Sequence, residues 1–260
     1  MKTCSGFLFL ILLVTGFLYT GCDGPGNCID GNGIVQTETR ITGSFTGISS
    51  ESFFDVYLIQ DSIEEVIVEA ESNLLPYIQT VVSGSVLILR EQKHYCLDNT
   101  LPVKITVRVK NLEKVALTGS GNIQGNSELE THSLEIDLTG SGNIDMEVKA
   151  QQVEAWLGGS GNIDLGVTTY DIQATITGSG DLHFWGETLD SDVTITGSGN
   201  IRAYGLVQDN CYVTITGSGS VYVFVNDYLD VKITGSGSVY YRGSPQIKAS
   251  ITGSGKVVPG

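Results

Sequence analysis

The sequence predicts an all-β fold, a β-solenoid (β-helix-like) of about eight 18–21-residue coils with an N-terminal β cap region. A Thr-Gly-Ser-Gly-Asn motif begins at Thr118 and recurs, with variation, in eight copies at steps of 21, 19, 19, 19, 20, 18 and 18 residues. Apolar and polar residues alternate on both sides of each copy, which indicates strands with one buried face. Helix is excluded because so regular a series of glycines would interrupt any helix that carried it.

Residues 1–21 are expected to be a lipoprotein signal peptide. Lys2 precedes an apolar run over residues 7–18, which is too short to span a bilayer but suits a secretory signal. The run ends in Leu-Tyr-Thr-Gly-Cys, which resembles the lipobox of bacterial lipoproteins and makes Cys22 the expected site of lipidation. Tyr19 stands where leucine is usual, so ordinary cleavage to a soluble secreted protein is the alternative.

Residues 22–36 are expected to form a flexible tether. With Cys4 in the signal and Cys22 acylated, three of the five cysteines remain, namely Cys28, Cys96 and Cys211, so the chain is no disulfide-rich scaffold. Their spacing neither predicts nor excludes a bridge between Cys28 and Cys96. No Cys-x-x-Cys pair occurs, and neither a metal site nor a cofactor is expected.

Residues 37–111 lack the motif and are expected to form an N-terminal β region that caps the solenoid. Strand-like runs occupy residues 54–59 and 66–70, and apolar residues alternate over 103–109. A cap is required because the first coil would otherwise offer unpaired strand edges to other chains.

Residues 112–260 are expected to form the motif-repeat solenoid, in which each coil is a strand, a Gly-Ser-Gly corner and a second strand. Leu134, Ile136 and Leu138 illustrate the inward row that precedes each corner, and stacking at about 4.8 Å would merge such rows into one core. The joint at the other end of each coil is looser and is expected to absorb the variation in period. The glycines assigned to the structural turns are Gly119, Gly121, Gly140, Gly142, Gly178, Gly180, Gly197, Gly199, Gly217 and Gly219.

Asparagines at one place of successive coils, Asn122, Asn143 and Asn162, are expected to form a structural ladder of amides along the axis. Asp181 cannot donate, so the ladder should be confined to the N-terminal half of the solenoid.

The order of the strand-like segments before the first motif, closed by Asn-Leu-Glu-Lys-Val-Ala-Leu-Thr-Gly-Ser-Gly over residues 111–121, resembles a known family. It is the family described as putative auto-transporter adhesin, head GIN domain, whose members are exported and often lipid-anchored proteins of the Bacteroidetes type. The resemblance covers nearly all of residues 37–260. It implies an all-β, solenoid-like body and a surface location, and it supplies no catalytic residue.

Aromatic residues mark a candidate binding face on the outward side of the coils. Trp185, Tyr204 and Phe224 stand eight places after the motif start on three consecutive coils, and Tyr222 and Tyr240 stand two places nearer the corner. Such rings suit a glycan, a protein receptor or a sister protomer in a homo-oligomer. The alternative is a ladder of rings that only shields the sheet.

Two acidic residues raise the question of catalysis. Asp145 and Asp164 occupy one place on adjacent coils, and the spacing of about 4.8 Å is near the separation of a retaining glycosidase pair, about 5 to 5.5 Å. Any solenoid with two acidic neighbours meets this condition, so two solvated carboxylates or a weak cation site is the favoured interpretation. No nucleophile elbow or phosphate-binding helix start accompanies them.

Charge excludes one class of partner. Fourteen Lys and Arg oppose 29 Asp and Glu, and a net charge of −15 repels nucleic acid. The sequence therefore predicts a non-enzymatic, adhesin-like binding or structural lipoprotein, exported and attached to the membrane through its N-terminal lipid, at the outer membrane or cell surface. The alternatives are a polysaccharide lyase or glycosidase on a β-solenoid, and an envelope scaffold that binds proteins.

Overall fold

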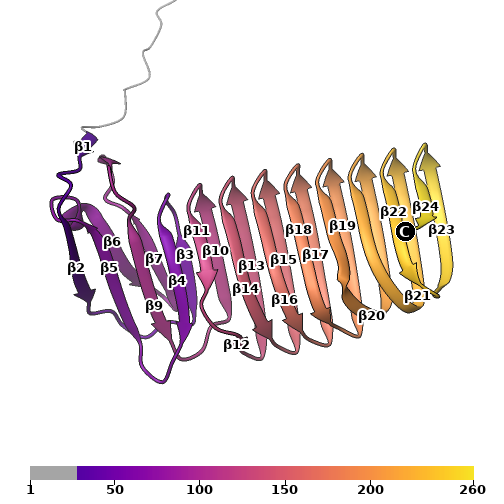
Figure 1. Ribbon diagram of the computed structural model, residues 1–260, viewed down its shortest axis with the longest axis horizontal. Helices are drawn as coiled ribbons and strands as arrows, with labels where there is room; N and C mark the ends of the chain where they lie inside the picture. The colour runs from indigo at the N-terminus through magenta and orange to yellow at the C-terminus, as the bar shows by residue number, and fades with distance from the viewer. Residues whose placement is uncertain (1–27) are drawn as a thin grey trace, which may run out of the picture.

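The computed structural model describes residues 28–260, which form a β-solenoid of about eight turns, as the sequence predicts. Each turn places one strand on each of two faces, and the turns lie side by side along the long axis (Figure 1). The expected signal peptide and Cys22 lie outside the described residues. In the part of the chain that is described, no helix is long and apolar enough to cross a membrane.

The strands of the first face each end at a Gly-Ser-Gly motif, here called the tight corner. They are β10 (Lys114–Gly119), β13 (Ser133–Gly140), β15 (Gln152–Gly159), β17 (Asp171–Gly178), β19 (Asp190–Gly197), the second halves of β20 (Asn200–Gly217) and β21 (Ser220–Gly235), and β23 (Gln246–Gly253).

The strands of the second face begin just after the tight corner and run to the joint at the other edge, here called the open corner. They are β11 (Asn122–Gly125), β12 (Leu129–Glu130), β14 (Asn143–Lys149), β16 (Asn162–Thr168), β18 (Asp181–Glu187), the first halves of β20 and β21, β22 (Ser238–Gly243) and β24 (Lys256–Pro259). The open corners lie along the lower edge of the solenoid in Figure 1.

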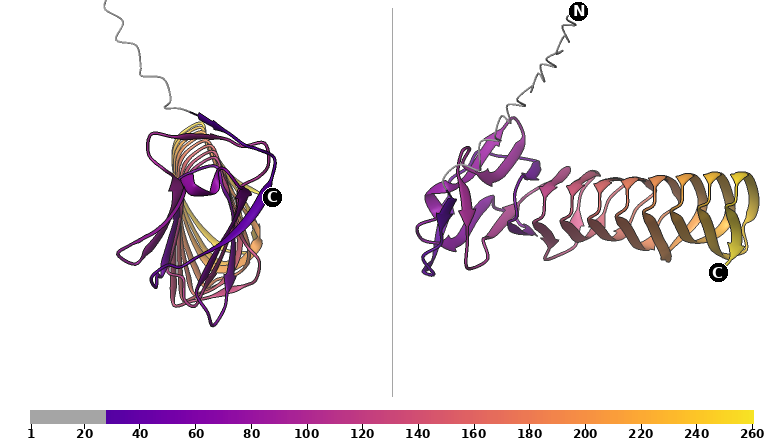
Figure 2. Two further views of the ribbon diagram at one scale, coloured as in Figure 1. Left: turned by 90° about the vertical axis from the view of Figure 1, so that its left-hand side faces the viewer. Right: turned by 90° about the horizontal axis from the view of Figure 1, so that it is seen from above.

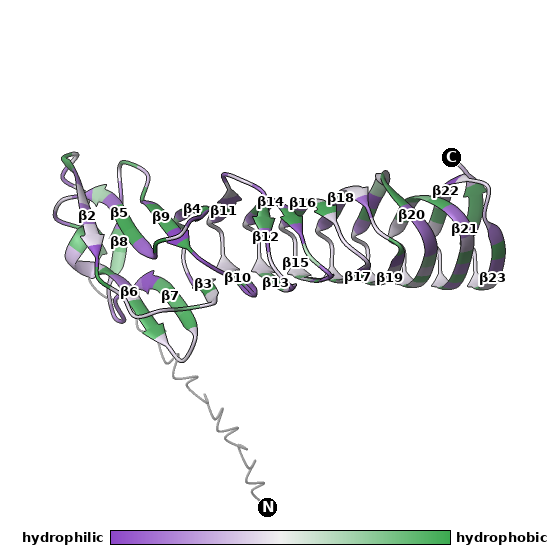
Figure 3. Cartoon of the chain, turned by 90° about the horizontal axis from the view of Figure 1, so that it is seen from below, coloured by the Kyte–Doolittle hydropathy of each residue, from purple (hydrophilic) through white to green (hydrophobic). Residues whose placement is uncertain are grey.

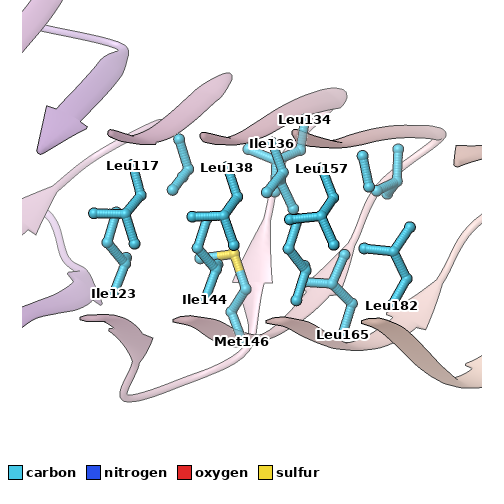
Figure 4. Packing of buried hydrophobic residues seen from close by; sticks show 14 of the residues in the cluster. Leu117, Ile123, Leu134, Ile136, Leu138, Ile144, Met146, Leu157, Leu165 and Leu182 are labelled. Carbon is cyan, nitrogen blue, oxygen red and sulfur yellow. The ribbon is translucent and has the colours of Figure 1, made fainter. Parts of the chain in front are cut away.

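The core is a set of aliphatic columns, because parallel pairing puts like residues over like. Leu138 pairs with Leu117 on one side and with Leu157 on the other. Figure 4 shows these leucines in a row, with Ile123 and Ile144 opposite them, and all five are buried. Burying one such side chain stabilises the fold by about 1.5 to 3 kcal/mol, and every turn contributes several.

The tight corner requires glycine at both places. Gly140 has a φ of 129°, and a Cβ on it would lie 2.3 Å from the carbonyl oxygen of Gly119 in the preceding turn. A Cβ on Gly142 would lie 2.3 Å from the carbonyl oxygen of Gly121. Without side chains the corners stack closely enough for the Gly119 carbonyl to accept the N–H groups of Ser141 and Gly142, at 3.0 and 3.1 Å.

The N-terminal region extends both faces before it closes them. On the first face β3 (Gly47–Ser50) and β7 (Val86–Glu91) continue the parallel stack from β10, and on the second face β4 (Asp55–Gln60) and β9 (Lys104–Val109) continue it from β11.

Antiparallel strands then complete the two stacks. The strand β6 (Ile78–Ser83) pairs with β7, while β5 (Glu65–Glu71) pairs with β9 and β2 (Val35–Arg40) pairs with β5. A short 3-10 helix, η1 (Leu75–Tyr77), joins β5 to β6 at the N-terminal end of the solenoid (Figure 2).

The strands from β2 to β9 are here called the head. A disulfide fastens the start of the described chain to this head. Cys28 is bonded to Cys96, and the strand β1 (Cys28–Asp30) pairs with β8 (Cys96–Asp98). The pairing that the spacing left open is therefore present. From Cys28 onward, the segment expected to be a flexible tether over residues 22–36 is attached to the body.

A buried carboxylate strengthens this attachment. The side chain of Glu71 is fully buried and accepts hydrogen bonds from the backbone of Gly33, from the backbone and hydroxyl of Thr100, and from the backbone of Leu101. Burial acts to raise the pKa of Glu71, but these hydrogen bonds outweigh it and hold the pKa below its ordinary value.

Candidate functional site

The expected aromatic column on the second face is broken by a register shift. Trp185 pairs with Gly205 rather than with Tyr204, and Phe224 pairs with Val207. The cause is that β20 carries extra residues after Ala203, which form a bulge within the strand instead of lengthening the open corner. Trp185, Tyr204 and Phe224 therefore do not lie one above another.

The tyrosines come together instead with an arginine. Tyr222 and Tyr240 are paired across adjacent strands and their rings are stacked, with centroids 4.9 Å apart and planes inclined by 10°. Tyr204 meets the ring of Tyr222 edge-on at 5.6 Å, and the guanidinium carbon of Arg242 lies 4.0 Å from the centroid of Tyr204. We call these four residues the tyrosine cluster.

Neighbouring side chains cover part of the ring surface in this cluster. Tyr222 lies between Tyr204 and Tyr240, and Arg242 covers a face of Tyr204. Partial burial raises the pKa of the Tyr204 hydroxyl, although the positive charge of Arg242 opposes the shift. Arg242 is exposed and the three tyrosines are half-buried, so the cluster presents a guanidinium and parts of its rings to solvent.

Trp185 lies apart from the cluster. Its indole covers Gly166 of the preceding turn, where an added Cβ would lie 2.6 Å from the indole nitrogen, and its ring is 5.3 Å from that of His183. Phe224 is paired with Arg242 and so borders the tyrosine cluster.

The acidic pair is in register but does not form an enclosed site. Asp145 pairs with Asp164, and Asp164 lies 3.3 Å from Nδ1 of His183, with side chains that are 42% and 50% exposed. Among residues 28–260 there is no group of three or more His, Cys, Asp or Glu side chains arranged to hold a metal ion.

The asparagine ladder forms as expected up to Asn162, but hydrogen bonds resume in the same column beyond the expected limit, where Asn200 donates to Asp181 over 2.9 Å. Asn162 donates to Asn143, and Asn143 donates to Asn122, each over 2.9 Å. Asn122 in turn donates to the carboxylate of Asp55 over 2.7 Å, so the ladder ends on a charged acceptor in the head. These amides are occupied with one another, which supports their structural role.

A groove along the open corner is a feature that the sequence reasoning missed. Its volume is about 780 Å³. It is lined by Glu130, Thr131, His132, Lys149, Ala150, Gln151, Thr168, Thr169, Tyr170, Glu187, Thr188, Leu189, Val207 and Asp209. The sequence signal for it is a pair of apolar residues, Tyr170 and Leu189, that stand one period apart at the variable joint.

Solved structures of similar shape carry related descriptions. A crystal structure described as a putative lipid binding protein from Parabacteroides distasonis has a TM-score of 0.85 at 28% sequence identity, covering 90% of this chain and 100% of that chain. A putative adhesin from Parabacteroides merdae has a TM-score of 0.85 at 24% identity with the same coverage, which shows a shared fold. No curated protein matches the chain. The family model described as putative auto-transporter adhesin, head GIN domain, matches residues 44–245, and the chain therefore belongs to that family.

Proposed function

We propose that the protein is a non-enzymatic, lipid-anchored adhesin of the cell surface that binds a protein receptor through the tyrosine cluster. Its family is described as putative auto-transporter adhesin, head GIN domain, and the structurally similar chain from Parabacteroides merdae is described as a putative adhesin. The observation that carries the proposal is the mutual stacking of Tyr222 and Tyr240 beside Arg242.

A protein receptor fits the cluster better than a glycan does. Sugars stack on open ring faces, but one face of Tyr222 is covered by Tyr240 and one face of Tyr204 is covered by Arg242. Tyrosine and arginine are the residue types enriched at the energetic centres of protein interfaces, where edges, hydroxyls and guanidinium groups make directed contacts. Parallel strands paired along the whole solenoid hold these groups in fixed positions.

The rival, a carbohydrate-active enzyme, has weaker support. A general acid in a glycosidase is kept protonated by an environment that excludes water, and it lies in a cleft that holds the sugar. Asp164 is instead 42% exposed beside His183, and neither Asp145 nor Asp164 lines the groove at the open corner.

Anchoring through Cys22 follows from the lipobox-like sequence. The expected mature protein begins at an acylated Cys22, six residues before the disulfide-bonded Cys28. Mass spectrometry of the purified protein tests this, since acylation adds the mass of lipid at Cys22 and the Cys22→Ala variant should lack it. Digestion by protease added to intact cells supports a surface position, and protection contradicts it.

Adhesion of cells that display the full chain tests the receptor. Cells carrying the Tyr222→Ala/Tyr240→Ala variant should lose binding to immobilised proteins and cell layers that the natural chain binds. A matched control is Tyr212→Ala/Tyr228→Ala, which removes another pair of neighbouring tyrosine rings, 6.1 Å apart, from the first face. Adhesion that survives protease treatment of the target but not periodate oxidation of its sugars would contradict a protein receptor.

A further inference from the structure

The groove at the open corner has two rims and a floor that repeat with every turn. One rim contains Thr168, Glu187 and Val207, which are paired in register on successive strands. The other rim contains Tyr170 and Leu189, and the nearly buried threonines between the rims form the floor. Because turns repeat every 4.8 Å or so, four turns give a track of roughly 15 to 20 Å, a length that suits a short linear polymer.

The backbone along this track offers no edge to an extended peptide. The N–H of Thr169 donates to Glu187, that of Thr188 donates to Val207, and that of Leu189 donates to Tyr170, over 3.1, 3.0 and 3.2 Å. Strand addition needs free N–H and C=O groups, and here they are used between successive turns. A peptide added as a strand is therefore not the occupant.

The rims are apolar in part but do not suit an acyl chain. Tyr170, Leu189 and Val207 are 62%, 49% and 47% exposed, an unusual concentration of apolar surface on three successive turns. The same groove is also lined by Gln151, Thr168 and Glu187, so it offers an acyl chain no continuous apolar lining.

The charge of the groove excludes an acidic polymer. Lys149 is paired with Glu130 over 2.8 Å, which leaves Glu187 and Asp209 as uncompensated negative charges among the lining residues. Strings of uronic or sialic acids would be repelled by them and by the net charge of the chain.

We propose that the open-corner groove is a binding site for a neutral linear oligosaccharide, with Tyr170 as its stacking platform. Tyr170 lines the groove and is 62% exposed, so its ring is accessible to the apolar side of a sugar. The amide of Gln151 and, on the opposite rim, the hydroxyl of Thr168 provide donors and acceptors within the same groove. The site shares no residue with the tyrosine cluster and does not depend on the proposed receptor.

Calorimetric titration of the full chain with defined oligosaccharides tests this site. The panel contains gluco-, manno- and N-acetylglucosamine oligomers of two to six units, together with an oligomer of galacturonic acid. A neutral series should bind, with affinity that rises with length until the groove is filled, and the uronic oligomer should not. Absence of binding by every neutral series, or equal binding of the uronic oligomer, would overturn the proposal.

Variants of one exposed tyrosine locate the binding. Tyr170→Ala should weaken binding by roughly three- to tenfold, while Tyr170→Phe, which keeps the ring, should stay close to the natural chain. Tyr212→Ala, which removes a similarly exposed tyrosine from the first face outside the groove, is the matched control. Affinity unchanged in Tyr170→Ala refutes the site. Affinity lost in Tyr222→Ala/Tyr240→Ala but kept in Tyr170→Ala would move the glycan site to the tyrosine cluster and refute the groove as the binding site.

Discussion

Replacing one glycine of a central tight corner by alanine should destabilise the solenoid far more than the size of a methyl group suggests. Gly178 has a φ of 142°, and a Cβ there would lie 2.4 Å from the carbonyl oxygen of Gly159. That oxygen accepts the N–H groups of Ser179 and Gly180 over 2.9 and 3.1 Å. The methyl group must therefore displace the acceptor on which the corner is stacked.

Two effects contribute to the expected loss of unfolding free energy. A non-glycine residue in such a conformation costs about 1 to 3 kcal/mol. Moving the Gly159 carbonyl weakens two hydrogen bonds that each contribute about 1 kcal/mol. Gly178→Ala should then lower the free energy of unfolding by about 3 to 5 kcal/mol.

Guanidinium titration followed by tryptophan fluorescence suits this measurement, because Trp156 and Trp185 lie on strands β15 and β18, on either side of the Gly178 corner. The turns of a solenoid need not unfold together. Circular dichroism on the same samples therefore reports whether the remaining turns unfold with this one. Gly84→Ala is the control, since Gly84 also has a positive φ of 63° but no atom lies within 4 Å of an added Cβ. If the two variants lose the same stability, close stacking of the corners is not what requires glycine.

Three further outcomes are expected. Removing the disulfide with Cys28→Ser should lower the stability of the head by about 4 kcal/mol, since the bridge closes a loop with a sequence separation of 68 residues; thermal unfolding measures this, and an unchanged midpoint would contradict it. Because the pKa of Glu71 is lowered by folding, its stabilisation is full above the unfolded pKa of about 4.3 and is lost as the pH falls through the folded pKa, so acid should loosen the head of the natural chain. Glu71→Gln should be less stable at neutral pH and should lose this part of the acid dependence; an acid response equal to that of the natural chain would count against the role of Glu71. Burial raises the pKa of the Cys211 thiol to about 12, so Ellman's reagent should react with it only after unfolding, and rapid reaction of the folded protein would contradict its burial.

The solenoid could be predicted from the sequence because its determinants are local and repeated. An inward row such as Leu134, Ile136 and Leu138 needs only alternation and a constant period to define a strand and its neighbours, and all three side chains are buried. Figure 3 shows the resulting change of hydropathy along the strands. Even a departure from the motif has a local cause, since Gly158 replaces the usual threonine where the indole of Trp156 covers it.

The head and the aromatic column could not be predicted in this way, because they depend on contacts between unlike segments. The corner at Ser52 and Phe54 lacks the motif, yet its carbonyls receive the N–H groups of Gly121 and Asn122, so the head carries parallel strands that no repeat reveals. The step of 20 residues between Thr196 and Thr216 indicated extra length without saying where it lies. The extra length lies in a bulge near Tyr204. The bulge places the ring of Tyr204 beside Tyr222 and out of register with Trp185.

Because the tight corner requires glycine, functional variation is restricted to the rest of the surface. At Gly197 and Gly199 an added Cβ would lie 2.3 Å from a carbonyl oxygen of the preceding turn, so no side chain can be presented there without unstacking the solenoid. At the open corner the same restriction holds only at Gly186 and Gly243 among the described residues, where an added Cβ would lie 2.0 Å from a carbonyl oxygen of the preceding turn, and the other places there carry side chains. Tyr170 and Leu189 occupy neighbouring open corners with their side chains largely exposed. Substitutions at these places should alter the groove while leaving the aliphatic columns intact, and the groove is therefore where members of such a fold can diverge in ligand at little cost in stability.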